Sequence, residues 1–411
     1  MRYVVSLLVS SSKTTPLGAQ QGPRAFAMRI ALFDYIVTAD NAIGKCDLAI
    51  LSALCDEHEF TVFSARFENP RPAKIRWVRV PVPLRPMALL FVIFHLLAPL
   101  CYVWHCFRYR VRFDVVQVIE SNLLFGDIAY SHFCHQAFLE RHWKEIGAAG
   151  PRGAMRWLDH RLRAFIEPWV YRRATRIVAP SRGLCRELMI AYPQAGAKIR
   201  VLANPVDLDR LRPPTRFDRD GFRRKLGWDP KDIVFAFVAL GHYERKGLPL
   251  LLEALGTARD LRLKAIVVGG SSGGIAVYRE RANKSGLNGC VRFLETQKDV
   301  RPYLWAADAL ALPSYYEVFP LVALEAAAAG LPLLVTQLNG VEEFLRDGEN
   351  GLLMTRSTSG VSECLARFAG MPVEARRRMG MRAQSDVKCY GIAEFVAGWS
   401  KLYAEAGTHA G

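Results

Sequence analysis

Short apolar segments alternate with helix-length segments along most of the chain. Strand-like apolar runs lie at 28–35, 60–64, 75–82, 115–119 and 128–132 in the first half, and at 233–240, 263–269, 291–294, 309–313 and 331–336 in the second. Runs that are apolar at nearly every position and are separated by helical segments are typical of parallel sheets covered on both faces. The pattern predicts an α/β fold with two domains.

Proline-rich and polar stretches set the expected boundaries. The first domain is predicted over 28–204 and the second over 231–388, with a linker at 205–230 that contains Pro205, Pro213 and Pro214. Residues 389–411 are expected to form a C-terminal helix that packs back on the first domain. Residues 1–27 read as a disordered extension or a misassigned start, because the spacer before Ala25 and Ala27 is too long and polar for a signal peptide.

The segment 88–107 contains twenty residues without a formal charge, enough to cross a bilayer as a helix. A crossing is excluded if the strands before and after it share one sheet, so the helix is expected either to be buried or to lie in a membrane interface. Arginines and a lysine flank it, and no acid occurs between Arg71 and Arg112. Such a surface suits anionic lipid, with Phe91, Phe94 and Trp104 as the expected contacts.

Charge and cysteine usage narrow the partners. Residues 1–200 carry 27 lysines and arginines against 15 acids, a net charge of +12 out of +16 for the 411 residues. An anionic partner follows, but no nucleic-acid-binding motif is legible, so a membrane or a phosphorylated substrate is favoured. The nine cysteines form no CxxC pair, which favours a reducing cytoplasm over a disulfide or zinc framework.

The most informative stretch runs from Pro313 to Pro332, between two predicted strands. Glu317 is expected in a loop and Glu325 on a helix, with Pro320 as the first helical residue and Gly330 as its cap. The first-turn amides of Leu321 and Val322 would form an anion site at the carboxyl end of a parallel strand. Glu325 lies about 7 Å further along the helix, the step from a phosphate to a ribose. Two alternatives to these binding roles remain. Glu325 could be a solvated helix residue, and Glu317 could merely be a first-turn acid that the helix dipole favours.

This Glu-x7-Glu pattern followed by Ala-Gly-Leu-Pro resembles the retaining, nucleotide-sugar-dependent glycosyltransferases of family four, which have the GT-B fold of two Rossmann-like domains facing across a cleft. Further similar segments are Val178-Ala-Pro-Ser181, Lys198 to Asp207, Gly241-His-Tyr-Glu-Arg245-Lys246-Gly247, Ala306-Ala-Asp308 and Asp347 to Gly351. The likeness extends from Met28 to the C-terminus and is strongest to bacterial enzymes that build lipopolysaccharide core and other surface glycans.

The resemblance implies roles for particular residues. Glu317 would hold the sugar hydroxyls, Glu325 the ribose, and Arg245 and Lys246 the diphosphate, whose charge grows as it departs. Phe319, Leu321, Val322, Gly241 and Gly44 would line the donor site, Gly44 in place of a glycine pair. A histidine at a strand end would face the reacting carbon, and His132 fits this role, with His135 as the alternative.

Two departures from the family pattern bear on the affinity or identity of the donor. Pro320 stands where many members have glycine, and His242 stands where many have arginine. The acid pair Asp207 and Asp209 resembles a metal motif of another fold but lies in the linker, so no metal is expected, and no cofactor besides the nucleotide-sugar donor.

The predicted function is transfer of a hexose to a saccharide or lipid-linked acceptor by a cytoplasmic protein bound peripherally at the inner face of the plasma membrane. An epimerase or phosphorylase is disfavoured by the missing motifs, and a catalytically silent scaffold of the same fold is the alternative.

Overall fold

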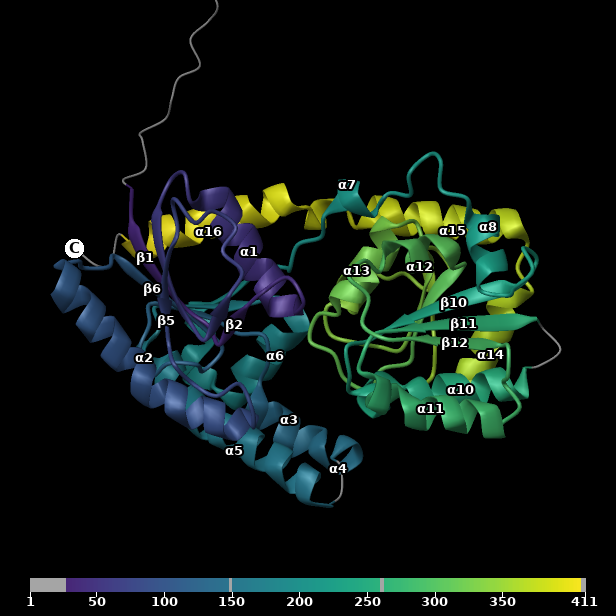
Figure 1. The fold of residues 1–411 in the computed structure, drawn as a ribbon, viewed down its shortest axis with the longest axis horizontal. Helices are drawn as coiled ribbons and strands as arrows, with labels where there is room; N and C mark the ends of the chain where they lie inside the picture. Colours follow the sequence, from purple (N-terminus) through teal and green to yellow (C-terminus); the bar gives the residue numbers. More distant parts are fainter. Residues whose placement is uncertain (1–26, 148–149, 259–261, 408–411) are drawn as a thin grey trace, which may run out of the picture.

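The computed structural model describes residues 27–147, 150–258 and 262–407, which form two lobes on either side of a cavity (Figure 1). Each lobe is built around one large parallel sheet with helices on both faces. This architecture is the predicted α/β fold of two Rossmann-like domains.

The sheet of the first lobe has seven parallel strands. Their order is β5 (Arg76–Arg79), β3 (Glu59–Ser64), β1 (Arg29–Phe33), β6 (Val115–Ile119), β7 (Ile128–Tyr130), β8 (Arg176–Ala179) and β9 (Ile199–Val201). In β1, Ile30 and Leu32 enter one apolar core while Ala31 and Phe33 enter a second on the opposite face. The strand is therefore apolar throughout because both faces are covered. A separate two-stranded pair joins β2 (Ile36–Val37) to β4 (Arg66–Phe67).

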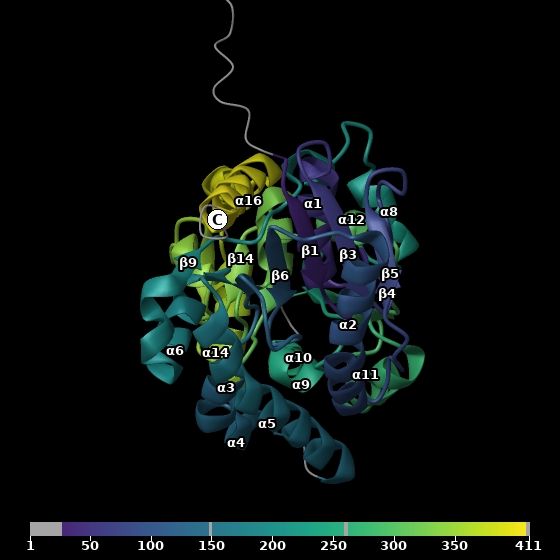
Figure 2. The ribbon, with the colours of Figure 1, turned by 90° about the vertical axis from the view of Figure 1, so that its left-hand side faces the viewer.

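Helices cover both faces of this sheet (Figure 2). They are α1 (Ala42–Leu54), α2 (Met87–Tyr109), α3 (His135–Arg141), α4 (Trp143–Ile146), α5 (Gly150–Arg173) and α6 (Arg182–Ala191). A 3₁₀ turn, η1 (Pro193–Lys198), leads to β9. In the sequence, the helices α7 (Leu208–Leu211) and α8 (Arg219–Lys225) connect the last strand of this sheet to the first strand of the second sheet.

The sheet of the second lobe has six parallel strands. Their order is β12 (Val291–Leu294), β11 (Leu263–Val268), β10 (Ile233–Val238), β13 (Ala309–Leu312), β14 (Leu333–Val335) and β15 (Gly351–Leu353). Its helices are α9 (Tyr243–Lys246), α10 (Leu248–Thr257), α11 (Ser272–Lys284), α12 (Arg301–Ala306), α13 (Leu321–Ala328), α14 (Thr358–Ala369) and α15 (Val373–Asp386), with 3₁₀ turns η3 (Val341–Glu343) and η4 (Lys388–Tyr390).

Most strands are shorter than their apolar runs predict. The runs at 115–119 and 291–294 coincide with β6 and β12, whereas 128–132 ends as a strand at Tyr130 and 331–336 covers only Leu333–Val335. The sequence did not indicate β8, β9 or β15 as strands. They have only three or four residues, and the edge strand β9 exposes Arg200 and Val201, so no apolar run marks it.

Helix α2 joins β5 to β6 of one sheet, as the topological argument expected. By length and composition α2 could span a membrane, but Phe91 and Phe94 lie in the core of the first lobe. The expectation that these two residues contact lipid is therefore wrong. Trp104 is 62% exposed.

The last helix, α16 (Ile392–Gly407), returns to the first lobe (Figure 1). Its Trp399 is fully buried, with its ring centroid 5.0 Å from that of Tyr130. The hydroxyl of Tyr403 donates to Oε1 of Gln117 on β6. The α16 helix therefore ties the end of the described chain to the first sheet. The predicted extension at 1–27 lies outside the described residues except for Ala27.

Candidate functional site

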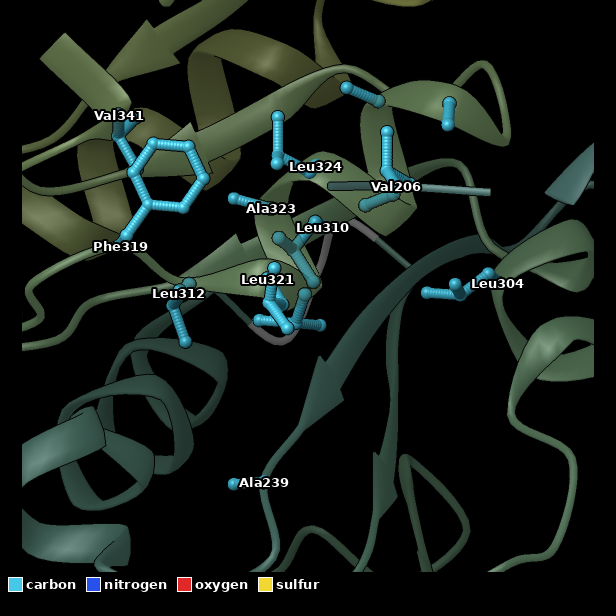
Figure 3. Close-up of a cluster of buried hydrophobic side chains, with 14 of the residues drawn as sticks. Val206, Ala239, Leu304, Leu310, Leu312, Phe319, Leu321, Ala323, Leu324 and Val341 are labelled. Atoms are coloured by element: carbon cyan, nitrogen blue, oxygen red, sulfur yellow. The ribbon is translucent and has the colours of Figure 1, made fainter. Parts of the chain in front are cut away.

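Helix α13 is fixed by an apolar core. Leu321, Ala323 and Leu324 lie close to Leu310 and Leu312 of β13, within one cluster of buried side chains (Figure 3). The helix begins at Leu321 with Pro320 as its N-cap, one residue later than predicted, and Gly330 follows the C-cap Ala329 with φ of 83°. As first-turn residues, Leu321 and Val322 have no acceptor within the helix for their amides. The start of α13, whose free amides could favour an anion, is thus held in place by packing against β13.

The loop after β10 approaches the loop after β13 closely. The amide of Tyr315 donates to the carbonyl of Arg245 at 2.7 Å. A Cβ on Gly247 would lie 2.0 Å from the carbonyl oxygen of Pro313, and Gly247 has φ of 79°. Only glycine fits there without strain. This approach places Arg245 and Lys246 beside Glu317.

Glu317 is paired with Lys246, whose Nζ lies 2.8 Å from Oε1 of the carboxylate. Burial by itself would raise the pKa of Glu317, but Lys246 and Arg245 outweigh it and hold the pKa below its usual value. Glu317 is therefore an ionised hydrogen-bond acceptor whose side chain is largely buried. Such a group can accept from the hydroxyls of a sugar.

Glu325 also meets a cation, which the sequence did not indicate. Nζ of Lys45 on α1 lies 2.7 Å from Oε1 of Glu325, and the side chains are 47% and 18% exposed. The pair crosses from the first lobe to the second. Glu325 therefore faces the first lobe, and Lys45 would compete with the hydroxyls of a bound ribose for Oε1 of its carboxylate.

A cavity of about 260 Å³ lies between the lobes. Side chains from both lobes line it: Ile43, Glu120, His132, Phe133, Phe138, Trp143, Ile146, Arg156, His160, Pro180 and Asn204 from the first lobe and the segment that leaves it, and His242, Arg245, Glu317, Val318 and Phe319 from the second. The predicted residues Arg245, Glu317, Phe319 and His132 thus share one cavity. Lys246 joins them through Glu317.

His132 rather than His135 faces this cavity. Its Nε2 is buried without a hydrogen-bond partner among the described residues. Burial lowers the pKa of His132 to about 4, against an opposing effect of Glu120, so the ring is neutral at pH 7. His135 instead places Nδ1 2.8 Å from Nδ1 of His160. Nε2 of His135 also lacks a hydrogen-bond partner among the described residues, but His132 is the one of the two that lines the cavity, so its nitrogen is the one available there to a ligand.

Glu120 is a cavity residue that no sequence motif indicated. It follows β6 with φ of 51°, a conformation rare outside glycine. Nη1 of Arg163 lies 3.2 Å from its carboxylate. Burial would raise the pKa of Glu120, but His135 and Arg163 lower it to about 2. The carboxylate is therefore ionised in the wall of the first lobe.

The cavity lining does not include five of the predicted donor-site residues, which are Gly44, Gly241, Leu321, Val322 and Glu325. Gly44 donates its amide to Oδ1 of Asn41 at 2.6 Å, so this N–H already has an acceptor, and its role toward a donor stays a prediction. Gly241 precedes His242, which lines the cavity. Asp207 caps α7 by accepting from the amide of Arg210 at 3.0 Å, which gives it a structural role.

The Glu317 loop is also held by the first lobe. Ser181 donates its hydroxyl to the carbonyl of Val318 at 2.8 Å, and the hydroxyl of Tyr316 donates to Glu187 at 2.7 Å. Both contacts are buried. The lobes therefore meet directly at the cavity and hold the loop from either side.

Two family models match the chain in succession. "Glycosyltransferase Family 4" matches residues 48–210, and "Glycosyl transferases group 1" matches residues 218–386. Together they cover both lobes. The chain belongs to the group 1 glycosyl transferases.

Curated relatives of this group 1 transferase include D-inositol 3-phosphate glycosyltransferases. The protein of Rhodococcus erythropolis is 35% identical over 230 residues, 51% of this chain and 51% of its own length. That of Nocardia farcinica is 32% identical over 253 residues, 58% and 54% of the two chains. The match spans about half the length of these relatives.

Solved structures of similar fold cover nearly the whole group 1 transferase. WaaG, a glycosyltransferase involved in lipopolysaccharide biosynthesis, has a TM-score of 0.73 at 19% identity over 91% of this chain and 99% of its own. Anabaena Alr3699/HepE in complex with UDP and glucose has a TM-score of 0.68 at 17% identity over 92% and 100%. These likenesses establish the GT-B fold.

Proposed function

We propose that the protein transfers a hexose from a nucleoside diphosphate sugar to a saccharide or lipid-linked acceptor, with retention of the anomeric configuration. The observation that carries this proposal is the convergence of Glu317, Arg245 and His132 from two lobes on one cavity, with Lys246 paired to Glu317. The start of α13 supplies amides for a diphosphate, and Glu317 supplies an acceptor for sugar hydroxyls.

The reaction needs stabilisation of a departing diphosphate. As the bond between the anomeric carbon and the diphosphate oxygen breaks, negative charge grows on that oxygen, and Lys246 and Arg245 offset it. The acceptor hydroxyl forms the new bond on the same face and passes its proton to the leaving phosphate oxygen. His132 is neutral, so its free Nε2 can hold a hydroxyl of the sugar or the acceptor rather than donate a proton from an imidazolium.

Lys246 and Arg245 offset the negative charge of the diphosphate, which a divalent metal would otherwise neutralise. We therefore propose that turnover is independent of metal. Activity that survives an excess of EDTA supports this, and activity restored only by Mg²⁺ or Mn²⁺ refutes it.

Membrane association forms part of the proposal because α2 carries an exposed apolar stripe. Leu96, Leu100 and Phe107 are 63%, 64% and 78% exposed and follow one another at helical spacing. Arg108 and Arg110, at the end of the helix, are exposed as well. An apolar stripe beside cations favours the surface of an anionic bilayer.

Helix α5 buries two charged side chains and exposes several large apolar ones. Arg163 and Glu167 are 4% and 1% exposed, whereas Phe165 and Trp169 are 72% and 51% exposed. The α5 helix packs beside α2 in the first lobe (Figure 1). The exposed Phe165 and Trp169 suit an apolar environment, which supports a lipid-linked acceptor and a role in bacterial surface-glycan synthesis at the inner face of the plasma membrane.

The test starts from a thermal-shift screen of UDP-, GDP- and ADP-sugars. With the stabilising donor, slow release of the nucleoside diphosphate without acceptor is expected, and Lys246→Ala should depress it while the protein stays folded. The anomeric configuration of the product, read by NMR, tests retention. Absence of release with every donor would refute the enzyme and favour the silent scaffold.

A further inference from the structure

Arg156 reaches from the first lobe to the loop of the second lobe that carries Arg245 and Lys246. It lies on α5, and its Nη2 is 2.6 Å from Nδ1 of His242. Because a guanidinium can only donate, Nδ1 of His242 is the acceptor. The backbone of His242 has φ of 55°, a left-handed conformation that is rare outside glycine. The contact brings a third cation to the cavity.

Arg156 has no counter-charge in the part of the chain that the structure describes. Lys246 is paired with Glu317, but none of the described residues gives a carboxylate within ion-pair distance of Arg156 or Arg245. Nε of Arg245 is buried without a hydrogen-bond partner among them. Two guanidinium groups therefore face one cavity whose two carboxylates, Glu317 and Glu120, are already paired with Lys246 and Arg163.

The titration behaviour agrees with this excess of positive charge. Burial lowers the pKa of Arg156, and Arg245 lowers it further. Burial together with Arg245, Arg156 and Lys246 lowers the pKa of His242 to about 4. Glu317, the carboxylate that faces His242, opposes this shift only in part. The ring is neutral at pH 7, so it can hold the guanidinium without adding charge.

A purely structural role would give Arg156 a different setting. Arg163, on the same helix, is 4% exposed and ion-paired to Glu120 and Asp159. Arg156 is exposed, lines the cavity and takes part in no ion pair among the described residues. Its position is that of a ligand-binding cation rather than a packing residue.

We propose that Arg156 is a donor-binding residue, and that Arg156 and Arg245 hold the diphosphate of the nucleotide sugar from opposite lobes. This inference rests on the proposed function. It adds a charge from the acceptor-side lobe, so that the donor itself links the two lobes. His242 then acts as a positioning residue that aims the guanidinium.

The experiment measures binding of UDP, GDP and ADP by calorimetry without acceptor. Arg156→Ala should weaken binding of the nucleotide that the wild type prefers by about tenfold, the loss expected for a charge-assisted hydrogen bond. The double variant Arg156→Ala, His242→Arg, which supplies the cation from the loop, should recover most of this affinity. Arg161→Ala, which removes an exposed arginine that lies over Trp157 on the same helix, is the matched control and should bind like the wild type.

The corresponding nucleoside separates a phosphate contact from damage to the fold, because its affinity should be equal in all four proteins. Equal nucleoside diphosphate affinity in Arg156→Ala and wild type would overturn the inference. This result would overturn the inference even if Arg156→Ala raised the Michaelis constant for an anionic acceptor, since Arg156 would then serve the acceptor and not the donor. Wild-type protein that binds none of the three nucleotides would refute the proposed function as well.

Discussion

Replacing Glu325 by alanine should weaken nucleotide binding, by an amount that the structure allows one to work out. In the proposed complex the carboxylate accepts from the ribose hydroxyls, and hydrogen bonds to a charged group contribute about 1.5–3 kcal/mol. In the free protein the same carboxylate is held by Lys45 at 2.7 Å. Breaking that pair opposes binding.

In the ion pair, the side chain of Lys45 is 47% exposed and that of Glu325 is 18% exposed. Because solvent screens such a pair, breaking it costs about 0.5 kcal/mol. The net loss in Glu325→Ala is then about 1–2.5 kcal/mol, roughly a 5- to 70-fold rise in the dissociation constant. Lys45→Ala removes the competing cation and leaves Glu325 in place. It should bind the nucleotide as well as the wild type or up to about threefold more tightly.

Calorimetry with the preferred nucleoside diphosphate and with its 2′-deoxy analogue provides the assay. The wild type should discriminate against the deoxy analogue, and Glu325→Ala should not. Unchanged affinity in Glu325→Ala would remove this residue from the ribose site. Weaker binding in Lys45→Ala would show that Lys45 contacts the nucleotide, contrary to this reasoning.

Three further predictions concern the loop, the membrane face and pH. Gly247→Ala should lower the free energy of unfolding by about 2–3 kcal/mol through strain, whereas Gly273→Ala, with open space on α11, should not; equal denaturation midpoints would contradict the close approach at Pro313. Replacing Leu96, Leu100 and Phe107 by glutamine should abolish flotation with phosphatidylglycerol vesicles, while glutamines at the exposed Val277, Val373 and Met381 should leave it intact; flotation of both triple variants would refute the membrane face. Burial raises the pKa of Asp34 to about 8, so the contribution of this group to stability is fully present below about pH 4 and is lost as pH rises through 8. Thermal unfolding should show a smaller loss of stability from pH 6 to 9 in Asp34→Asn, and parallel curves would refute the assignment.

The parts of the fold that were predictable are those in which local sequence and burial agree. β6 is buried at all five positions, and its apolar run gives its bounds without error. The start of α13 was predicted to within one residue because proline and the alanine run mark it. The strand β9 escaped prediction because two of its three residues are exposed at a sheet edge.

The candidate site divides in the same way. Glu317 and Lys246 are marked by spacing within short segments, and the structure joins them at 2.8 Å. Lys45 and Arg156 reach the site only through packing of one lobe on the other, at 280 and 86 residues from their partners. No local pattern encodes such contacts. The periodicity of α2 was misread at Phe91 and Phe94 because an almost wholly apolar helix does not reveal which face is inside.

The central claim is that the start of α13 and the Lys246–Glu317 pair bind the diphosphate and the sugar of one donor. A crystal structure of the protein with the nucleotide sugar selected by the thermal-shift screen tests it most directly. The claim predicts diphosphate oxygens within hydrogen-bond distance of the amides of Leu321 and Val322 and of Nζ of Lys246, with sugar hydroxyls on Glu317. A diphosphate bound away from these atoms would contradict it.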